Sequence, residues 1–323
     1  MRFRLLVLLL LGAGLAGCAD DPQLGQGCVM ETVAELPVLN DRGSPVVEVA
    51  INGAKSAFVV DTGARVSLIY EDAAERLGLP SDPEHFHLLN GIGGSVFSHL
   101  VTVDKLSLGT AAARHVELDS VPGGRPRSVG GLPVIGLFGG DFLANYDVEF
   151  DLPGHLVTLF KEVHCSNNLR PWQTGDYYRL PFTLENETAI RFDIAINGHN
   201  ESVVLDSGAF RTIIDNDAAN DGGANRQTMA QDRTNIARGI DGNGLIAHRH
   251  RFDSLDIGPE HFAPAYLDVA DLDTPGLVGA DFFRARKVWI SYPHQVFYVQ
   301  RVLFPHRAAP KQPDATSPNA PKH

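Results

Sequence analysis

The sequence has little cysteine and less positive than negative charge, and only one long apolar run. Its 323 residues include 3 Cys, and 27 Lys and Arg stand against 39 Asp and Glu, for a formal charge of −12. No Cys-x-x-Cys pair occurs, which argues against a thiolate zinc site. Because Lys and Arg form no cluster that would bind a phosphate backbone, nucleic acid is not an expected partner. No metal or other cofactor is expected.

The single long apolar run lies at the N-terminus, from Leu5 to Leu15, and is too short to span a bilayer comfortably. Two small residues and then Cys18 follow it. This pattern resembles a bacterial lipoprotein signal, which implies removal of residues 1–17, a lipid on Cys18 and a place on the membrane in the cell envelope, with the folded part outside the cytoplasm. An ordinary signal peptide with a coincidental cysteine is the alternative.

The other two cysteines, Cys28 and Cys165, form an even pair in an exported, oxidising setting. They are candidates for a disulfide, whose geometry the sequence does not specify. Residues 18–32 are expected to be a tether. Residues 303–323 are rich in Pro, Ala and Lys without periodicity, and are expected to be a disordered tail.

Internal repetition organises the rest of the chain. Three segments recur at offsets of 145, 145 and 140 residues, a period that indicates duplicated domains rather than a solenoid. We expect a first domain over 33–160, a linker over 161–176 and a second domain over 177–302. The matching segments are Val49–Gly53 with Ile194–Gly198, Phe58–Ala64 with Val203–Ala209, and Leu137–Leu143 with Leu277–Phe283.

Each copy has the pattern of a turn-rich β-domain, in keeping with 32 Gly and 20 Pro. An Asn-Gly turn joins two strands, and a short helix is expected at Glu71–Leu77. A Gly-rich hairpin follows, and then alternating strands such as Leu100–Leu108 and Arg249–Ile257. One final strand closes each copy, at Val148–Phe160 and at Val288–Gln300.

The repeated motif that carries chemistry is Asp-Thr/Ser-Gly-Ala at the end of an apolar strand. If a pseudo-twofold axis brings Asp61 and Asp206 together, their carboxyls would share one proton, because two like charges so close cannot both ionise cheaply. One carboxylate would then activate a water, and its protonated partner would polarise a carbonyl. The neighbouring residues would support the loops: Gly63 and Gly208 through tight turns, and Thr62 and Ser207 through hydroxyl bonds to the opposite loop.

At these residues the sequence resembles a retropepsin-type aspartic protease, duplicated in one chain over about residues 33 to 302. The resemblance rests on the paired motif, a glycine-rich flap and a later apolar-apolar-Gly segment in each copy. It implies a mainly β fold of two tandem retropepsin- or pepsin-like acid-protease β-barrel domains, related by a pseudo-twofold axis. It also implies a monomeric pseudo-dimer that cleaves peptide or protein substrates with Asp61 and Asp206 as the catalytic dyad.

Two departures qualify the resemblance. Ala64 and Ala209 stand where pepsins carry Ser or Thr, so a hydroxyl donor to the ionised carboxylate is lost. We therefore expect raised dyad pKa values and activity at mildly acidic to neutral pH. The pepsin flap tyrosine is also missing, and each copy offers its own candidate substrate-binding flap. The two flap tips are Gly91-Ile92-Gly93-Gly94 and Gly239-Ile240-Asp241-Gly242.

Other interpretations remain open at this point. The same fold could be a non-catalytic peptide-binding module, or the chain could be a structural lipoprotein of the cell surface. The pairs His85-x-His87 and His248-x-His250 favour a solvated face over a metal site, because no further ligand is fixed by spacing. Asp141 and Asp281 are expected to cap a helix or to bond to the core.

Overall fold

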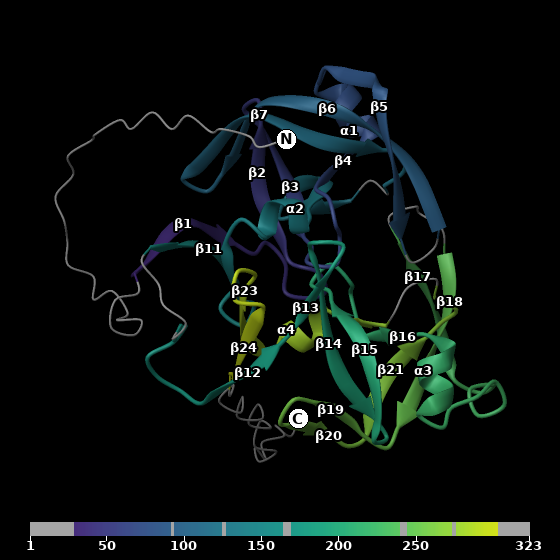
Figure 1. Cartoon of the computed structure of the whole chain (residues 1–323). Helices are drawn as coiled ribbons and strands as arrows, with labels where there is room; N and C mark the ends of the chain where they lie inside the picture. The colour runs from purple at the N-terminus through teal and green to yellow at the C-terminus, as the bar shows by residue number, and fades with distance from the viewer. Residues whose placement is uncertain are drawn as a thin grey trace, which may run out of the picture.

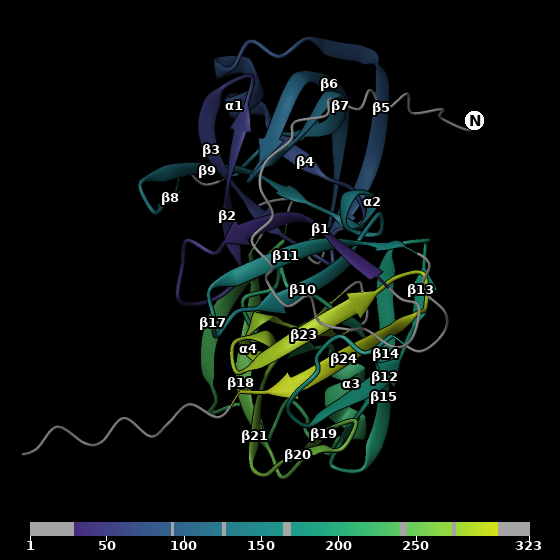
Figure 2. The ribbon, with the colours of Figure 1, turned by 90° about the vertical axis from the view of Figure 1, so that its left-hand side faces the viewer.

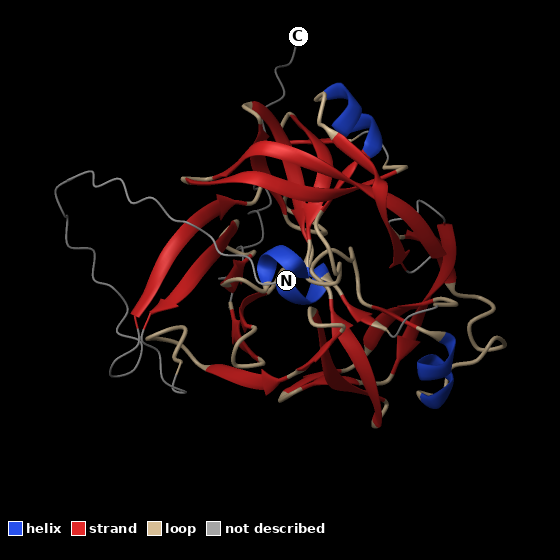
Figure 3. Ribbon diagram, turned by 45° about the horizontal axis from the view of Figure 1, so that its top comes forward, coloured by secondary structure: helices blue, strands red, loops and turns tan. Residues whose placement is uncertain are grey.

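The computed structural model describes residues 29–91, 94–124, 127–163, 169–239, 244–272 and 276–302. The expected signal peptide and tail, together with Cys18, Cys28 and Cys165, lie outside these residues. Within them the chain is mainly β, as expected, with short helices between the strands (Figure 3). No helix among the described residues is long and apolar enough to cross a membrane.

The first half, residues 29–163, contributes an eight-stranded sheet in the order β2-β3-β9-β4-β7-β6-β5, with β8 on β9. Strand β2 pairs with both β3 and β6, which curls the sheet toward a barrel (Figure 1). Asn52 and Gly53 have φ of 51° and 89°, as the tight turn between β2 and β3 requires. The elements are β2 (Val46–Ile51), β3 (Ala54–Val60), β4 (Leu68–Tyr70), α1 (Glu71–Arg76), β5 (Ser81–Gly91), β6 (Gly94–Leu108), β7 (Ala111–Val121), β8 (Ser128–Val129), β9 (Leu132–Phe138) and α2 (Gly140–Leu143).

The second half, residues 169–302, repeats this plan in a ten-stranded sheet, in the order β17-β18-β21-β16-β22-β15-β14-β19-β20 with β13 on β14. Its turn residues Asn197 and Gly198 have φ of 50° and 83°, as in the first half. The elements are β13 (Thr183–Glu185), β14 (Ala189–Ile196), β15 (His199–Leu205), β16 (Ile213–Ile214), α3 (Asn216–Asp221), β17 (Arg233–Arg238), β18 (Gly244–Phe252), β19 (Leu255–Ile257), β20 (Glu260–Phe262), β21 (Ala265–Val269), β22 (Leu277–Val278) and α4 (Ala280–Phe283).

A third sheet joins the halves, with three strands from each (Figure 2). Its order is β1-β11-β10-β23-β24-β12, and the halves meet where β10 and β23 pair antiparallel, with Glu149 opposite Trp289. This arrangement gives the pseudo-twofold relation that the duplication predicts. The strands are β1 (Val29–Pro37), β10 (Asp147–Asp151), β11 (Leu156–Val163), β12 (Tyr177–Pro181), β23 (Arg286–Ser291) and β24 (Val296–Arg301).

One apolar core runs through both halves and the inner face of this shared sheet. Phe150 of β10 and Phe283 of α4 meet across the junction, with ring centroids 5.1 Å apart. Fully burying a Phe side chain contributes about 1.5–3 kcal/mol. The two halves therefore stabilise each other through a common core.

Several expected boundaries are wrong. Strand β1 begins at Val29, inside the segment expected to be a tether, because Val29 already pairs with Val163 of β11. The same pairing carries β11 as far as Val163, inside the expected linker. Each expected final strand is in fact two antiparallel strands, since a turn at Leu152–His155 reverses the chain between β10 and β11, and a turn at Tyr292–Gln295 does so between β23 and β24. The expected strand Arg249–Ile257 is likewise interrupted between β18 and β19.

Candidate active site

Two loops of matching sequence, Asp61–Ala64 and Asp206–Ala209, meet between the halves; we call them the aspartate loops. Each begins where a buried strand ends, after β3 and after β15. The Asp61 N–H donates to the Phe138 carbonyl at 2.9 Å, and the Asp206 N–H donates to the Val278 carbonyl at 2.9 Å. Each loop is thus held by the parallel strand beside it.

The hydroxyls of Thr62 and Ser207, both fully buried, fasten the loops to each other. Thr62 Oγ1 donates to the Leu205 carbonyl at 2.7 Å and accepts from the Ser207 N–H at 3.0 Å. Ser207 Oγ donates to the Val60 carbonyl at 2.8 Å and accepts from the Thr62 N–H at 3.1 Å. Four reciprocal hydrogen bonds therefore fix the two aspartates relative to each other.

Each aspartate accepts hydrogen bonds from its own loop. Asp61 Oδ1 accepts from the N–H groups of Gly63 at 2.9 Å and Ala64 at 3.0 Å. Asp206 Oδ1 accepts from those of Gly208 and Ala209, both at 2.8 Å. These bonds hold both carboxyls in place and leave Oδ2 of each free of its own loop.

The glycines of the two loops bring the carboxyls together. A Cβ on Gly63 would overlap the carboxyl of Asp206, and a Cβ on Gly208 would overlap that of Asp61. Each carboxyl therefore lies against the main chain of the opposite loop, where only glycine leaves room.

Burial dominates the electrostatics of the pair. It raises the pKa of Asp61, although hydrogen bonds from Asp206, Ala64 and Gly63 act in the other direction. Burial and then the charge of Asp61 raise the pKa of Asp206 well above its ordinary value. Because two adjacent buried carboxylates repel each other, the pair retains one proton at a pH at which isolated aspartates are ionised.

Asp141 and Asp281 bond to residues that follow the aspartate loops in the chain. Asp141 Oδ1 accepts from the Ser67 N–H at 2.8 Å and from its hydroxyl at 2.7 Å. Asp281 Oδ1 accepts from the Thr212 N–H at 2.9 Å and its hydroxyl at 2.8 Å. The N-cap positions of α2 and α4 are glycines without a side-chain cap. Of the two roles expected for these aspartates, the bond to the core is therefore the correct one.

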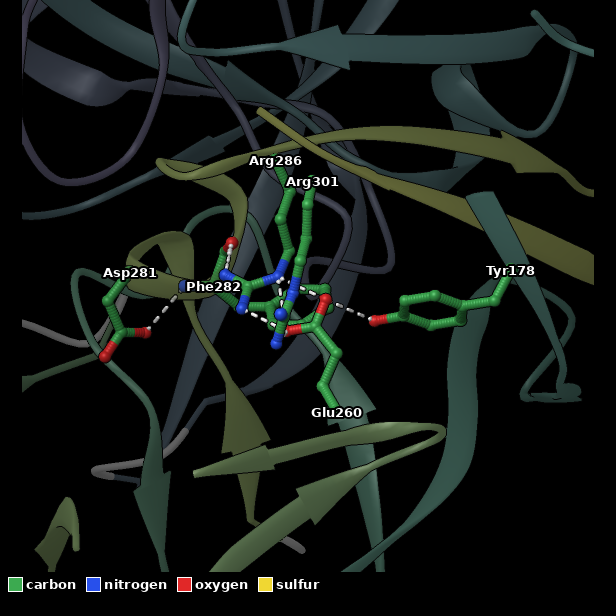
Figure 4. Close-up of polar contacts among 6 residues, drawn as sticks. All are labelled: Tyr178, Glu260, Asp281, Phe282, Arg286 and Arg301. Carbon is green, nitrogen blue, oxygen red and sulfur yellow. Dashed lines mark hydrogen bonds and ion pairs between the residues drawn. The ribbon is translucent and has the colours of Figure 1, made fainter. Parts of the chain in front are cut away.

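In the second half a buried ion cluster extends this support (Figure 4). Glu260, 3% exposed, accepts from Arg286 and from Arg301, and Tyr178 Oη donates to it at 3.0 Å. Arg286 Nη1 also donates to the Phe282 carbonyl of α4 at 2.9 Å. Burial raises the pKa of Glu260, but the hydrogen bonds from the two arginines outweigh it, and the pKa lies below its ordinary value.

The two expected flaps are hairpins, β5–β6 (the first hairpin) and β17–β18 (the second hairpin). Gly91 ends β5, Gly94 begins β6 and Gly239 follows β17. Ile92, Gly93, Ile240, Asp241 and Gly242 lie outside the described residues. Each hairpin packs in one apolar cluster with the alanine of its aspartate loop: Leu89 and Val96 with Ala64, and Ala237 and Leu245 with Ala209.

One further contact across the junction could not be predicted from the sequence. Ser44 Oγ donates to the Gly208 carbonyl at 2.5 Å, and Arg284 donates to the carbonyls of Gly43 and Asn40. The first half thereby braces the second aspartate loop from outside. Only a turn-like composition marks this segment in the sequence, and that signal does not identify its partner.

Several histidines expected on a solvated face have carboxylate partners. His85 pairs with Asp82 at 2.8 Å, and His250 pairs with Asp232 at 2.7 Å. Among the described residues, no three His, Cys, Asp or Glu side chains are grouped so as to hold a metal ion.

Two β-domains that share a sheet and bring paired aspartate loops together define the architecture of an aspartic peptidase. The aspartyl protease family model matches residues 47–142 and 192–282, more than half of the chain. The chain therefore belongs to the aspartyl protease family, and the two matches agree with the duplication. No curated protein matches it in sequence.

Proposed function

We propose that the protein is an aspartic endopeptidase that hydrolyses peptide bonds with a water activated by Asp61 and Asp206. The observation that carries this proposal is the reciprocal fastening of the two loops, with the partly buried carboxyl of Asp61 next to the buried carboxyl of Asp206. A turn in a structural domain has no need for two carboxyls whose mutual repulsion costs stability. Membership of the aspartyl protease family supports the same conclusion.

The chemistry follows from the shared proton. The ionised carboxylate takes a proton from a water held between the two groups, and the water attacks the peptide carbonyl carbon. The protonated carboxyl donates to the carbonyl oxygen, where negative charge develops. As the C–N bond breaks, the proton taken from the water passes to the leaving amine, and a hydroxyl of the tetrahedral intermediate returns a proton to the other carboxyl, which leaves the pair with one proton again. Two aspartyl carboxyls that share one proton are the established case of this chemistry.

The raised pKa values set the expected pH range. The pair is active with one proton, and a raised pKa means that this proton is kept as pH rises through the range in which ordinary aspartates lose theirs. We expect cleavage at mildly acidic to neutral pH. A pH–rate profile tests this, and maximal cleavage below about pH 3 would contradict it.

The central experiment replaces each aspartate by the isosteric amide. Asp61→Asn and Asp206→Asn should each lower kcat on the order of 10³-fold or more in a peptide-library assay, because neither variant has the paired acid and base. Asp193→Asn is the matched control, since this exposed aspartate of β14 lies outside the site. A statine-type inhibitor reports binding independently of turnover. Binding without cleavage by the wild-type protein would indicate a peptide-binding module. A wild-type protein that neither binds the inhibitor nor cleaves peptides would rule out the protease.

We also propose that a lipid on Cys18 anchors the protein in the bacterial cell envelope. The support is the sequence pattern at the N-terminus. Cys18→Ser should move the protein from the membrane fraction to the soluble fraction, and an unchanged distribution would reject the anchor.

A further inference from the structure

Each half buries a carboxylate beneath the base of its hairpin, outside the dyad. These are Asp119 on β7 and Asp268 on β21, 5% and 6% exposed. They occupy equivalent positions, because the Asp119 N–H donates to the Ser67 carbonyl and the Asp268 N–H to the Thr212 carbonyl, both at 3.2 Å. Ser67 and Thr212 follow the aspartate loops by three residues. A buried carboxylate is costly without partners, so its contacts fix where it lies.

In the first half, Asp119 contacts both strands of the first hairpin. Its Oδ1 lies 2.9 Å from His87 Nδ1 on β5 and accepts from the Ser98 hydroxyl on β6. His87 and Ser98 are direct partners in the hairpin register. One carboxylate therefore fastens both strands to β7.

In the second half, Asp268 does the same with other donors. Its Oδ1 accepts from Arg249 Nη1 on β18 at 3.0 Å, and its Oδ2 accepts from Asn235 Nδ2 on β17 at 3.1 Å. Both strands of the second hairpin are again held by one carboxylate. The donors differ: an imidazole and a hydroxyl in the first half, a guanidinium and an amide in the second.

The fastened face of each hairpin also carries a residue of the apolar cluster that includes the alanine of the aspartate loop. Side chains alternate along a strand, so Leu89 shares a face with His87, and Ala237 shares a face with Asn235. Leu89 and Ala237 pack in the apolar clusters that contain Ala64 and Ala209 of the aspartate loops. Each buried carboxylate thus links its hairpin, through one main-chain bond, to the segment that follows the aspartate loop.

We propose that Asp119 and Asp268 are positioning residues for substrate binding, each holding its hairpin against the aspartate loop of its own half. The inference rests on the proposed endopeptidase function. Because the hairpin would contact the bound peptide rather than the reacting atoms, loss of either carboxylate affects KM more than kcat.

The test compares Asp119→Asn with Asp82→Asn, which removes an exposed His–Asp pair from the same hairpin. Asp119→Asn should raise KM about tenfold, as expected for loss of a charge-assisted hydrogen bond, with kcat changed less than about threefold. Asp82→Asn should change neither. Unchanged KM in Asp119→Asn, or the same loss in the Asp82→Asn control, would overturn the proposal.

Two further measurements separate positioning from a general structural role. The double variant His87→Asn/Leu100→Arg gives the first hairpin the donors of the second half, since Leu100 lies opposite Asp119 as Arg249 lies opposite Asp268. His87→Asn alone should raise KM, and the double variant should reverse most of that increase. A double variant no better than the single one would count against fastening by donor chemistry.

Hydrogen exchange keeps this test independent of proteolysis. Asp119→Asn should speed amide exchange in β5 and β6, and Asp268→Asn should do so in β17 and β18, with the other half unaffected. If the wild-type protein cleaves no peptide, the proposed function fails while exchange still decides whether the carboxylates hold the hairpins. Exchange that is unchanged, or that rises evenly over the whole chain, would reject their positioning role.

Discussion

In both halves the aspartate loop is held by the same three devices: a hydroxyl that crosses to the other half, a glycine beneath the opposite carboxyl, and an aspartate behind the loop. Thr62 and Ser207 make matching bonds in opposite directions. Asp141 and Asp281 each accept an N–H and a hydroxyl. The hydroxyl and the glycine act across the pseudo-twofold axis, whereas the aspartate behind each loop acts within its own half, so the agreement extends over the whole surroundings of the aspartate loops.

The halves differ farther from the aspartate loops. Glu260 follows the turn after β19, and the equivalent residue after β6 in the first half is Ala111, which packs against the apolar core. Arg286 likewise corresponds to Tyr146, which also packs there. The residue after this turn thus contacts the shared-sheet side of its half through ions in the second half and through apolar packing in the first.

The strongest test of the symmetry is a methyl group on each loop glycine. Gly63→Ala and Gly208→Ala should each abolish turnover, by about 10³-fold or more in kcat/KM, because the added Cβ overlaps the opposite carboxyl. The two effects should be of similar size. Steady-state kinetics with inhibitor titration of intact sites provides the measurement.

Gly53→Ala is the control for this pair. Gly53 is a turn glycine with φ of 89° and open space around its Cβ position, so its replacement strains the turn without touching the site. It should lower stability and leave kcat/KM per folded molecule unchanged. A large difference between Gly63→Ala and Gly208→Ala would show that the two loops are not equivalent.

The ion cluster allows the difference between the halves to be measured. Glu260→Gln should cost about 3–5 kcal/mol of unfolding free energy, because two arginine side chains would lose their buried countercharge. Glu48→Gln removes a more exposed pair with Lys55 and should cost less than about 1 kcal/mol. Urea denaturation measures both. Equal effects would mean that the buried cluster contributes no more than a surface pair.

The sequence predicted the repeated aspartate loops, and it did not predict the contacts that have no counterpart in the other copy. The two Asp-Thr/Ser-Gly-Ala motifs stand at equivalent positions of two similar segments. They predicted the duplicated β-fold and the hydroxyl contacts between the loops. They gave no sign of the Ser44 bond to Gly208 or of the Glu260 cluster, because these unite residues far apart in the chain and without a counterpart in the other copy. The apolar residues on both sides of the turn between β10 and β11 have the pattern of one continuous strand, which does not predict that turn.

The shared sheet holds another difference between the halves, in the carboxyl of Asp147. Burial and then the neighbouring Glu162 carboxyl raise the pKa of Asp147 to about 8. Glu162 in turn pairs with His294 at 2.9 Å. The residue equivalent to Asp147 in the second half is Lys287, which pairs with Asp151 at 2.6 Å. One half therefore carries an unfavourable buried acid where the other carries a compensated base.

Asp147→Asn should consequently stabilise the protein, and only above the pH at which an unfolded aspartate ionises. A carboxyl whose pKa is raised by folding binds its proton more tightly in the folded state, so stability is lost as pH rises from about 4 toward 8. The amide does not ionise, and the gain should reach on the order of 1–3 kcal/mol at pH 8 and vanish near pH 4. Asp151→Asn is the control of opposite sign, because it removes the partner of Lys287. Urea midpoints across this range decide the matter, and a gain independent of pH would show that Asp147 acts through packing rather than through its charge.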